Sequence, residues 1–314
     1  MWVSQVVGPR TSEVIEVRDP QPQDHQVLVE VLASGVCTSD LTPWRTGGAP
    51  GTPIRLGHEI VGRVVAAGRS AGRWLPGDEV TGLGDHGFAS RAVLDAAHIL
   101  PVPDHIEPAL ALGEPVADLA EALSRAGMTA GDRVAVVGLG FMGLGLVQLV
   151  KAQAPGLLIG IDPVPAARAR ALRLGADLVF APGEVTAEYC ASPGKAADAR
   201  ADIVMEATGV TPGLRTAGSL VRPFGTLCVV GYHHAGDAPM DMDLWYKAVT
   251  IVNGFCPDKM RLMGAMRQAL DLIASRRFSY EPLVTHRFGL GDVDQAYELM
   301  AARDEGFVKA VLTP

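Results

Sequence analysis

The sequence predicts an α/β protein with a doubly wound parallel sheet, preceded by a β-rich region. From about residue 115, continuously apolar strands alternate with helical segments, which is typical of a parallel sheet covered on both faces. Residues 1–100 instead hold short apolar or alternating runs between Pro, Gly and Asp turns, and they predict an all-β region. No helical periodicity occurs before about residue 108. The length of 314 residues fits about two domains.

The expected elements follow in order along the chain. In the first region we expect strands at 3–7, 14–18, 27–35, 60–68 and 78–82. In the alternating region we expect strands at 132–140, 156–162, 176–180, 201–209 and 225–231, with helices at 141–154, 165–175 and 211–221. The last part predicts a helix at 258–277, an extended segment at 281–288, a helix at 291–304 and a strand at 307–314.

Composition and charge exclude several classes of protein. The formal net charge of -8 argues against a general attraction to nucleic acids or acidic membranes. The N-terminus lacks the basic start and apolar stretch of a secretion signal, so we expect a cytoplasmic protein without a membrane segment. The four cysteines (37, 190, 228 and 256) are scattered, which fits a reducing compartment and argues against a disulfide framework.

The segment "GLGFMG" (138–143) predicts a dinucleotide site. The motif is weak alone, but here it follows a predicted strand, opens a helix and precedes a second strand that ends in Asp162. Gly138 would make the tight turn, Gly140 would let the backbone approach a pyrophosphate, and Gly143 would let helix and strand pack closely. The helix start, with Phe141 and Met142, would present N–H groups to the phosphates.

Asp162 favours NAD over NADP. Its carboxylate can accept hydrogen bonds from the adenosine ribose hydroxyls, and its charge would repel a 2′-phosphate at the same place. A solvated acid at the end of a strand is the alternative interpretation of this residue.

Taken in order, several motifs resemble the zinc-dependent medium-chain dehydrogenases/reductases, most closely the sorbitol and threonine dehydrogenase-like branch. The motifs are "GVCTSD", "GHEIVGRVVAAG", "PGDEV", "GEPVA", "VVGLGFMG", "GID", "EATG", "PLVTHRF" and "VKAVLTP", and they extend over essentially the whole chain. The resemblance implies a GroES-like catalytic domain at 1–117, a Rossmann NAD-binding domain at 118–255 and a returning catalytic segment at 256–314. It also implies a homodimer or homotetramer.

The resemblance implies a catalytic zinc site. Cys37, His58 and Glu114 match the metal ligands, and Glu59 matches a carboxylate that binds the metal or lies beside it. One thiolate, one imidazole and one carboxylate with an open position is the composition of a catalytic zinc site. Asp40 matches the acid that orients the histidine ligand. Taken singly, each residue has a structural alternative, such as a buried thiol acting as a small hydrophobe.

Two departures from the family concern zinc and the proton path. Only "TGLGDH" separates "PGDEV" from "GFASRAV", where many members insert a lobe with four cysteines, so we expect one catalytic zinc per chain and no structural zinc. Ser39 matches the hydroxyl that takes the proton from the alcohol. Thr42 stands where a histidine often hands that proton to solvent.

The resemblance implies a zinc- and NAD-dependent dehydrogenase that acts on a secondary alcohol, polyol or cyclitol, or on the matching ketone. The alternatives are a zinc-independent NAD(P)H-dependent reductase of activated double bonds and a non-enzymatic NAD(H)-binding protein of the same fold.

Four weaker signals remain open. Asp118 lies where the family puts an uncharged residue against the nicotinamide, so it could contact the cofactor or simply be an acid in the first turn of a helix. His233 and His234 follow a strand at the edge where ligands bind, or they form a polar loop. Lys309 could reach a cofactor phosphate.

Overall fold

The computed structural model describes residues 1–49, 51–186, 188–190, 200–234, 236–304 and 306–314. The chain divides into two compact units, one of residues Met1–Ala117 with Asp258–Pro314 and one of residues Asp118–Pro257. The division falls inside helix α2 (Gly113–Ala126). Within the described ranges, no helix is both long and apolar enough to cross a membrane.

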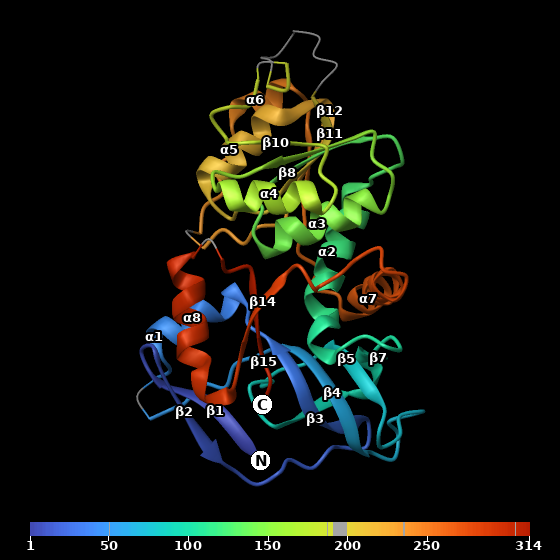
Figure 1. Ribbon diagram of the computed structural model, residues 1–314, viewed down its shortest axis with the longest axis vertical. Coiled ribbons are helices and arrows are strands. Elements are labelled where there is room, and N and C mark those ends of the chain that lie inside the picture. Colours follow the sequence, from blue (N-terminus) through green and yellow to red (C-terminus); the bar gives the residue numbers. More distant parts are fainter. Residues whose placement is uncertain (50, 187, 191–199, 235, 305) are drawn as a thin grey trace. The chain divides into compact units, whose positions relative to one another are not determined.

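The second unit is built on a six-stranded parallel sheet (Figure 1). Its strands stand in the order β10-β9-β8-β11-β12-β13, and every neighbouring pair is parallel. This is the order of a doubly wound nucleotide-binding sheet, so the predicted fold class is confirmed. The strands are β8 (Arg133–Val137), β9 (Leu157–Ile161), β10 (Leu178–Phe180), β11 (Ala201–Glu206), β12 (Val221–Val229) and β13 (Thr250–Asn253).

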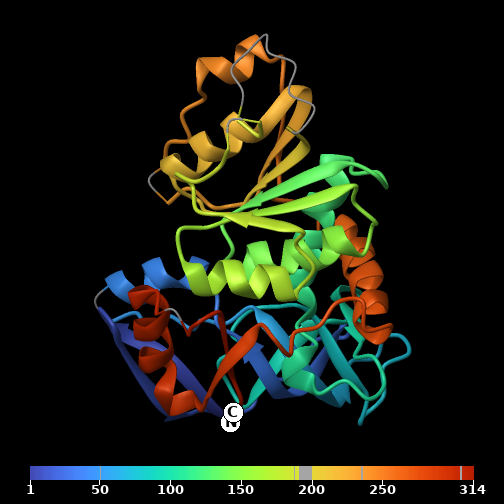
Figure 2. The same cartoon turned by 45° about the horizontal axis from the view of Figure 1, so that its top comes forward.

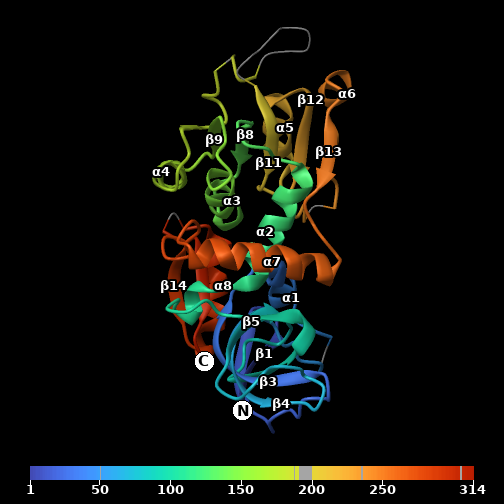
Figure 3. The same ribbon diagram turned by 90° about the vertical axis from the view of Figure 1, so that its right-hand side faces the viewer.

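Helices cover this sheet because its strands are apolar on both faces. Figure 3 shows α3 (Phe141–Lys151) and α4 (Pro165–Arg173) together beside the sheet. Helix α5 (Thr211–Leu220) packs against β8, β11 and β12, and the short α6 (Met242–Tyr246) packs on α5. Ile159, Val204 and Leu227 are at most 2% exposed, so burial of their side chains is the main stabilising term in this core.

The first unit is mainly β, with a seven-stranded sheet and a two-stranded antiparallel sheet (Figures 1 and 2). The larger sheet runs in the order β14-β15-β3-β4-β5-β7, with β6 paired to β3. Its strands are β3 (Gln26–Gly35), β4 (Glu59–Ala67), β5 (Glu79–Leu83), β6 (Arg91–Asp95), β7 (Ile99–Pro101), β14 (Val284–Phe288) and β15 (Lys309–Leu312), and the smaller sheet pairs β1 (Trp2–Gly8) with β2 (Thr11–Glu16). The last strand, β15, therefore lies beside an early one, β3.

Among the described residues, this unit also contains the helices α1 (Leu41–Thr46), α7 (Lys259–Ala274) and α8 (Val293–Ala302). The prediction that residues 1–100 are all-β is wrong at α1. That helix is only six residues long and includes Pro43, so it is too short to show a helical period. Trp44 of α1 and Tyr297 of α8 stack with ring centroids 5.3 Å apart, and both are fully buried.

Candidate metal centre and dinucleotide site

Cys37, His58 and Glu59 form a cluster of potential metal ligands. One donor atom from each lies within 4.8 Å of the others. Cys37 follows the end of β3 and Glu59 opens β4, and these two strands are antiparallel with Gly35 opposite Glu59. The strand register thus brings together residues more than twenty positions apart.

The carboxylate of Glu59 is buried, and one of its oxygens has no hydrogen-bond partner among the described residues. The residue is 1% exposed, and its Oε1 accepts a hydrogen bond from Lys309 Nζ at 2.5 Å. Oε2 has no hydrogen-bond partner among the described residues. A buried carboxylate oxygen left this way is costly unless a cation binds it, so the arrangement fits a metal ion.

Lys309 is placed differently from the sequence-based expectation. Its side chain is 4% exposed and forms an ion pair with Glu59, so the structure assigns its charge to that carboxylate rather than to a cofactor phosphate. Lys309 is the first residue of β15, which pairs with β14. It is 250 positions from Glu59 in the sequence, so no local pattern indicated the pairing.

Three acidic groups surround the imidazole of His58. Its Nδ1 lies 3.5 Å from Asp40 Oδ2. Burial lowers the pKa of His58, but Asp40, then Cys37 and then Glu114 outweigh this effect and raise the pKa to about 12. Such a concentration of negative charge around a ligand histidine is what a site for a divalent cation requires.

Asp40 is held by two further donors. Its Oδ2 accepts hydrogen bonds from Gly57 N at 3.4 Å and from the hydroxyl of Tyr297 at 3.3 Å. Burial, followed by the charge of Asp40, raises the pKa of Tyr297, so the hydroxyl keeps its proton and acts as a donor. The structure therefore links α8 to His58 through Asp40, a contact that the sequence did not indicate.

Glu114 and Ser39 lie near the cluster but outside the three-residue group. Glu114 is the second residue of α2, and its charge raises the pKa of His58. Its carboxylate oxygens do not belong to the group of donor atoms that lie within 4.8 Å of one another. Ser39 is in the single turn before α1, and its Oγ donates to Cys37 Sγ at 3.3 Å. Whether Glu114 binds the metal stays a prediction.

The glycine turn has the geometry that the sequence predicts for a phosphate-binding turn. Gly138 has φ of 90°, and a Cβ on Gly143 would lie 1.7 Å from Gly138 O, so both positions require glycine. A Cβ on Gly140 would meet nothing within 4 Å. The backbone at Gly140, just before Phe141 and Met142 open α3, thus faces open space of the kind that a pyrophosphate needs.

Asp162 lies directly beside this turn. Its Oδ2 accepts from Leu139 N and its Oδ1 from Val164 N, both at 2.8 Å. Each carboxylate oxygen retains a second lone pair, which could accept from a ribose hydroxyl. The guanidinium group of Arg168 donates to the backbone oxygen of Asp162 at 2.7 Å, so a positive charge lies beside this residue.

The remaining candidates occupy defined places. Asp118 lies in the second turn of α2, which corrects the alternative of an acid in the first turn. His234 is exposed and packs edge-on against Tyr232, with centroids 4.6 Å apart. His233 instead turns inward, with its Nε2 3.2 Å from Glu206 Oε2.

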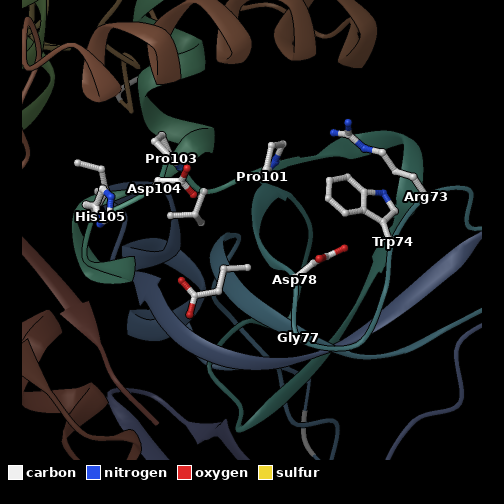
Figure 4. Close-up of a pocket in the computed structure, with 11 residues that line it drawn as sticks. Arg73, Trp74, Gly77, Asp78, Pro101, Pro103, Asp104 and His105 are labelled. Carbon is white, nitrogen blue, oxygen red and sulfur yellow. The ribbon is translucent and has the colours of Figure 1, made fainter.

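Pockets in the first unit lie both beside the cluster and away from it. A pocket of about 80 Å³ adjoins the cluster and is lined by Asp40, His58, Arg55, Asp85 and His86, among others. A larger pocket of about 550 Å³ is shown in Figure 4, and none of its lining residues is a candidate site residue. There, the Arg73 guanidinium lies over Trp74, and Asp78 accepts from Leu75 N, so these polar groups stabilise the local turn.

Comparison with known proteins identifies the class. Residues 23–104 match the family model of the alcohol dehydrogenase GroES-like domain, and residues 142–275 match that of the zinc-binding dehydrogenases. The chain is therefore a dehydrogenase with a GroES-like part and a nucleotide-binding part. It belongs to the zinc-type medium-chain alcohol dehydrogenase family.

Individual relatives agree with this family over nearly the whole length. L-galactonate-5-dehydrogenase of Escherichia coli is 28% identical over 94% of this chain and 93% of its own. Sorbitol dehydrogenase of Halalkalibacterium halodurans is 25% identical over 96% of this chain and 95% of its own. The structure of alcohol dehydrogenase TADH from Thermus sp. ATN1 matches with a TM-score of 0.86 at 25% identity, covering 100% of this chain and 99% of that one.

Proposed function

We propose that this protein is a zinc- and NAD-dependent dehydrogenase that oxidises a secondary hydroxyl group of a polyol or sugar acid, or reduces the matching ketone. The observation that carries the proposal is the cluster of Cys37, His58 and Glu59 in a chain of the zinc-type family. A zinc-independent reductase of activated double bonds would have no use for that cluster. Zinc supplies Lewis-acid chemistry that lowers the pKa of a hydroxyl group.

The chain's own residues have separate roles in the proposed reaction. Cys37, His58 and Glu114 would hold the metal, and Asp40 would orient the His58 ring. Ser39, whose Oγ lies 3.3 Å from Cys37 Sγ, would accept the hydroxyl proton of the substrate while it releases its own hydroxyl proton to water. The carbon-bound hydrogen would leave with its electron pair to the nicotinamide, so that a carbonyl group forms.

Glu59 would balance the charge of the metal centre. One of its oxygens lies within 4.8 Å of the donor atoms of Cys37 and His58, and Lys309 donates to Oε1, so the carboxylate would bind the metal or lie beside it. Three protein ligands would leave the fourth position of a zinc ion for the substrate, as in catalytic zinc sites.

A polar substrate is supported by the pocket next to His58. Arg55, Asp85 and His86 line it, and these side chains suit hydroxyl or charged groups better than an apolar alcohol. The relatives named for sorbitol, L-galactonate and L-threonine all act on polar substrates with hydroxyl groups.

The cofactor would bind to the second unit. Gly138, Gly140, Gly143 and the start of α3 would receive the pyrophosphate, and Asp162 would accept from the adenosine ribose. We propose NAD as the preferred cofactor because the Asp162 carboxylate would repel a 2′-phosphate. Asp118 stays a proposed cofactor contact.

A second copy of the chain is the proposed partner, as a homodimer or homotetramer. Strand β13 is an edge of the six-stranded sheet, and Ile251 on it is 47% exposed. Trp245, Tyr246 and Phe255 nearby in sequence are each more than 60% exposed. An apolar edge strand of this kind favours strand pairing with another copy. Ile251→Lys should then reduce the mass measured by light scattering, whereas an unchanged mass would exclude this edge.

We also propose that the protein works in the cytoplasm, which its four free cysteines support.

The activity is tested with purified zinc-loaded protein, NAD⁺ and a panel of polyols, sugar acids and simple secondary alcohols, measuring NADH formation. Cys37→Ser should abolish turnover and lower zinc content. Cys190→Ser, a matched change outside the cluster, should alter neither. No turnover on any substrate, or full activity of Cys37→Ser, would refute the proposal.

A further inference from the structure

A buried hydrogen bond between Glu206 and His233 lies within the second unit. Glu206 is the last residue of β11 and is fully buried. Its Oε2 lies 3.2 Å from His233 Nε2, and the histidine side chain is only 8% exposed. Because a carboxylate accepts but does not donate, Nε2 carries the proton in this contact.

Glu206 connects two turns at the same edge of the sheet. Its Oε1 accepts from Thr208 N at 2.7 Å and from Gly209 N at 3.1 Å, which fixes the turn after β11. Its backbone oxygen accepts from Val230 N and Gly231 N, which begin the segment after β12. His233 adds the side-chain link between this segment, residues 230–234, and the buried carboxylate.

Close backbone packing leaves these turns little room to move independently. A Cβ on Gly231 would lie 2.2 Å from Gly209 N, and a Cβ on Gly209 would lie 2.4 Å from Tyr232 O. A Cβ on Gly138 would lie 2.7 Å from Thr208 Cγ2, so the glycine turn of the cofactor site packs against the turn after β11. A shift of segment 230–234 would therefore reach the cofactor site.

The strand order indicates which half of the cofactor lies here. Asp162, which would accept from the adenosine ribose, follows β9, and the phosphate-binding turn follows β8. In a sheet of order β10-β9-β8-β11-β12-β13, the second nucleotide then extends past the carboxyl ends of β11 and β12. Glu206 and segment 230–234 occupy those ends.

We propose that His233 is a positioning residue for the nicotinamide half of the cofactor, acting through Glu206 on segment 230–234. The inference rests on the proposed NAD site. Without the His233 N–H, a fully buried carboxylate oxygen would lose its donor, and the segment or the carboxylate would have to rearrange. Loss of a hydrogen bond to a buried charged group is expected to weaken binding of the nicotinamide half roughly 10-fold or more.

The test compares two ligands on the full-length protein. NADH, titrated by fluorescence, carries both halves, whereas ADP-ribose, titrated by calorimetry, lacks the nicotinamide. His233→Ala should weaken NADH binding about 10-fold or more and leave ADP-ribose binding within about twofold. His233→Gln retains an N–H donor and should recover most of the NADH affinity.

His234→Ala is the matched control, because the neighbouring ring is exposed and packs on Tyr232 rather than on a carboxylate. It should bind both ligands as the unmodified protein does. Wild-type NADH affinity in His233→Ala would overturn the inference, and so would equal loss of both ligands, which would indicate a structural role only. Failure of the unmodified protein to bind NADH would instead refute the proposed NAD site itself.

Discussion

Replacing Gly35 with alanine should displace the Glu59 carboxylate from the candidate metal centre. A Cβ on Gly35 would lie 1.8 Å from Glu59 Oε2 and 2.8 Å from its Cδ. The oxygen must move by about 1.7 Å before the two atoms reach an ordinary contact of about 3.5 Å. Rotation is restricted because Oε1 is bound to Lys309 and the residue is buried. We therefore expect both a steric cost and weaker metal binding.

The steric cost of overpacking a buried site is about 1–3 kcal/mol. For a chain of 314 residues, that corresponds to a decrease in Tm of roughly 2–5 °C. Zinc affinity should fall roughly 10- to 100-fold, as it does when groups that support metal ligands are disturbed. Thermal unfolding measures the first effect, and competition with a chromophoric chelator measures the second.

Gly264→Ala is the control for this change. Gly264 lies inside α7, and a Cβ there would meet nothing within 4 Å. Alanine should therefore stabilise the helix by about 0.5–1 kcal/mol and leave zinc affinity unchanged. If Gly35→Ala retained wild-type Tm and zinc affinity, the described position of the Glu59 carboxylate would be wrong.

Four further changes address the proton path, the cofactor, the orientation of His58 and the metal. Ser39→Ala should lower kcat by about 10²-fold with unchanged zinc content, and a near-normal kcat would mean that another group takes the proton. Asp162→Ser should shift the kcat/KM ratio toward NADP⁺, whereas equal use of both cofactors by the unmodified protein would contradict the role of Asp162. Tyr297→Phe removes a buried donor to Asp40, so it should lower the free energy of unfolding by about 1–3 kcal/mol and weaken zinc binding. Wild-type zinc affinity in the chelator assay would disprove the link from Tyr297 through Asp40 to His58. Complete chelation of zinc should abolish turnover while NADH still binds, and elemental analysis should give one zinc per chain; two zincs, or full activity without metal, would overturn the assignment.

The parallel sheet was predictable because its signals are local. Strands β8 and β9 are short apolar runs bounded by turn residues, and the φ of 90° at Gly138 is a backbone conformation that favours glycine. Strand β13 was not predicted. It is four residues long, and most of its residues are exposed, so it lacks the nearly continuous burial of β8, β9 and β11.

The metal ligands could be selected from the sequence only through their resemblance to a family. No spacing rule joins Cys37 to His58, since the antiparallel register of β3 and β4 brings them together. The supporting contacts were less accessible still. Tyr297 reaches Asp40 across 257 positions, and Lys309 reaches Glu59 across 250. Only the folded chain shows such pairs.

The same separation has a consequence for protein synthesis. Ribosomes add roughly 5–20 residues per second, so about 10–50 s pass between the emergence of Glu59 and that of its partner Lys309, 250 positions later. During that interval the entire continuous unit Asp118–Pro257 is made, whereas β3 still lacks its neighbour β15. The nucleotide-binding half can therefore fold while the nascent chain is still growing, and the half that holds the metal cluster is completed only when translation ends.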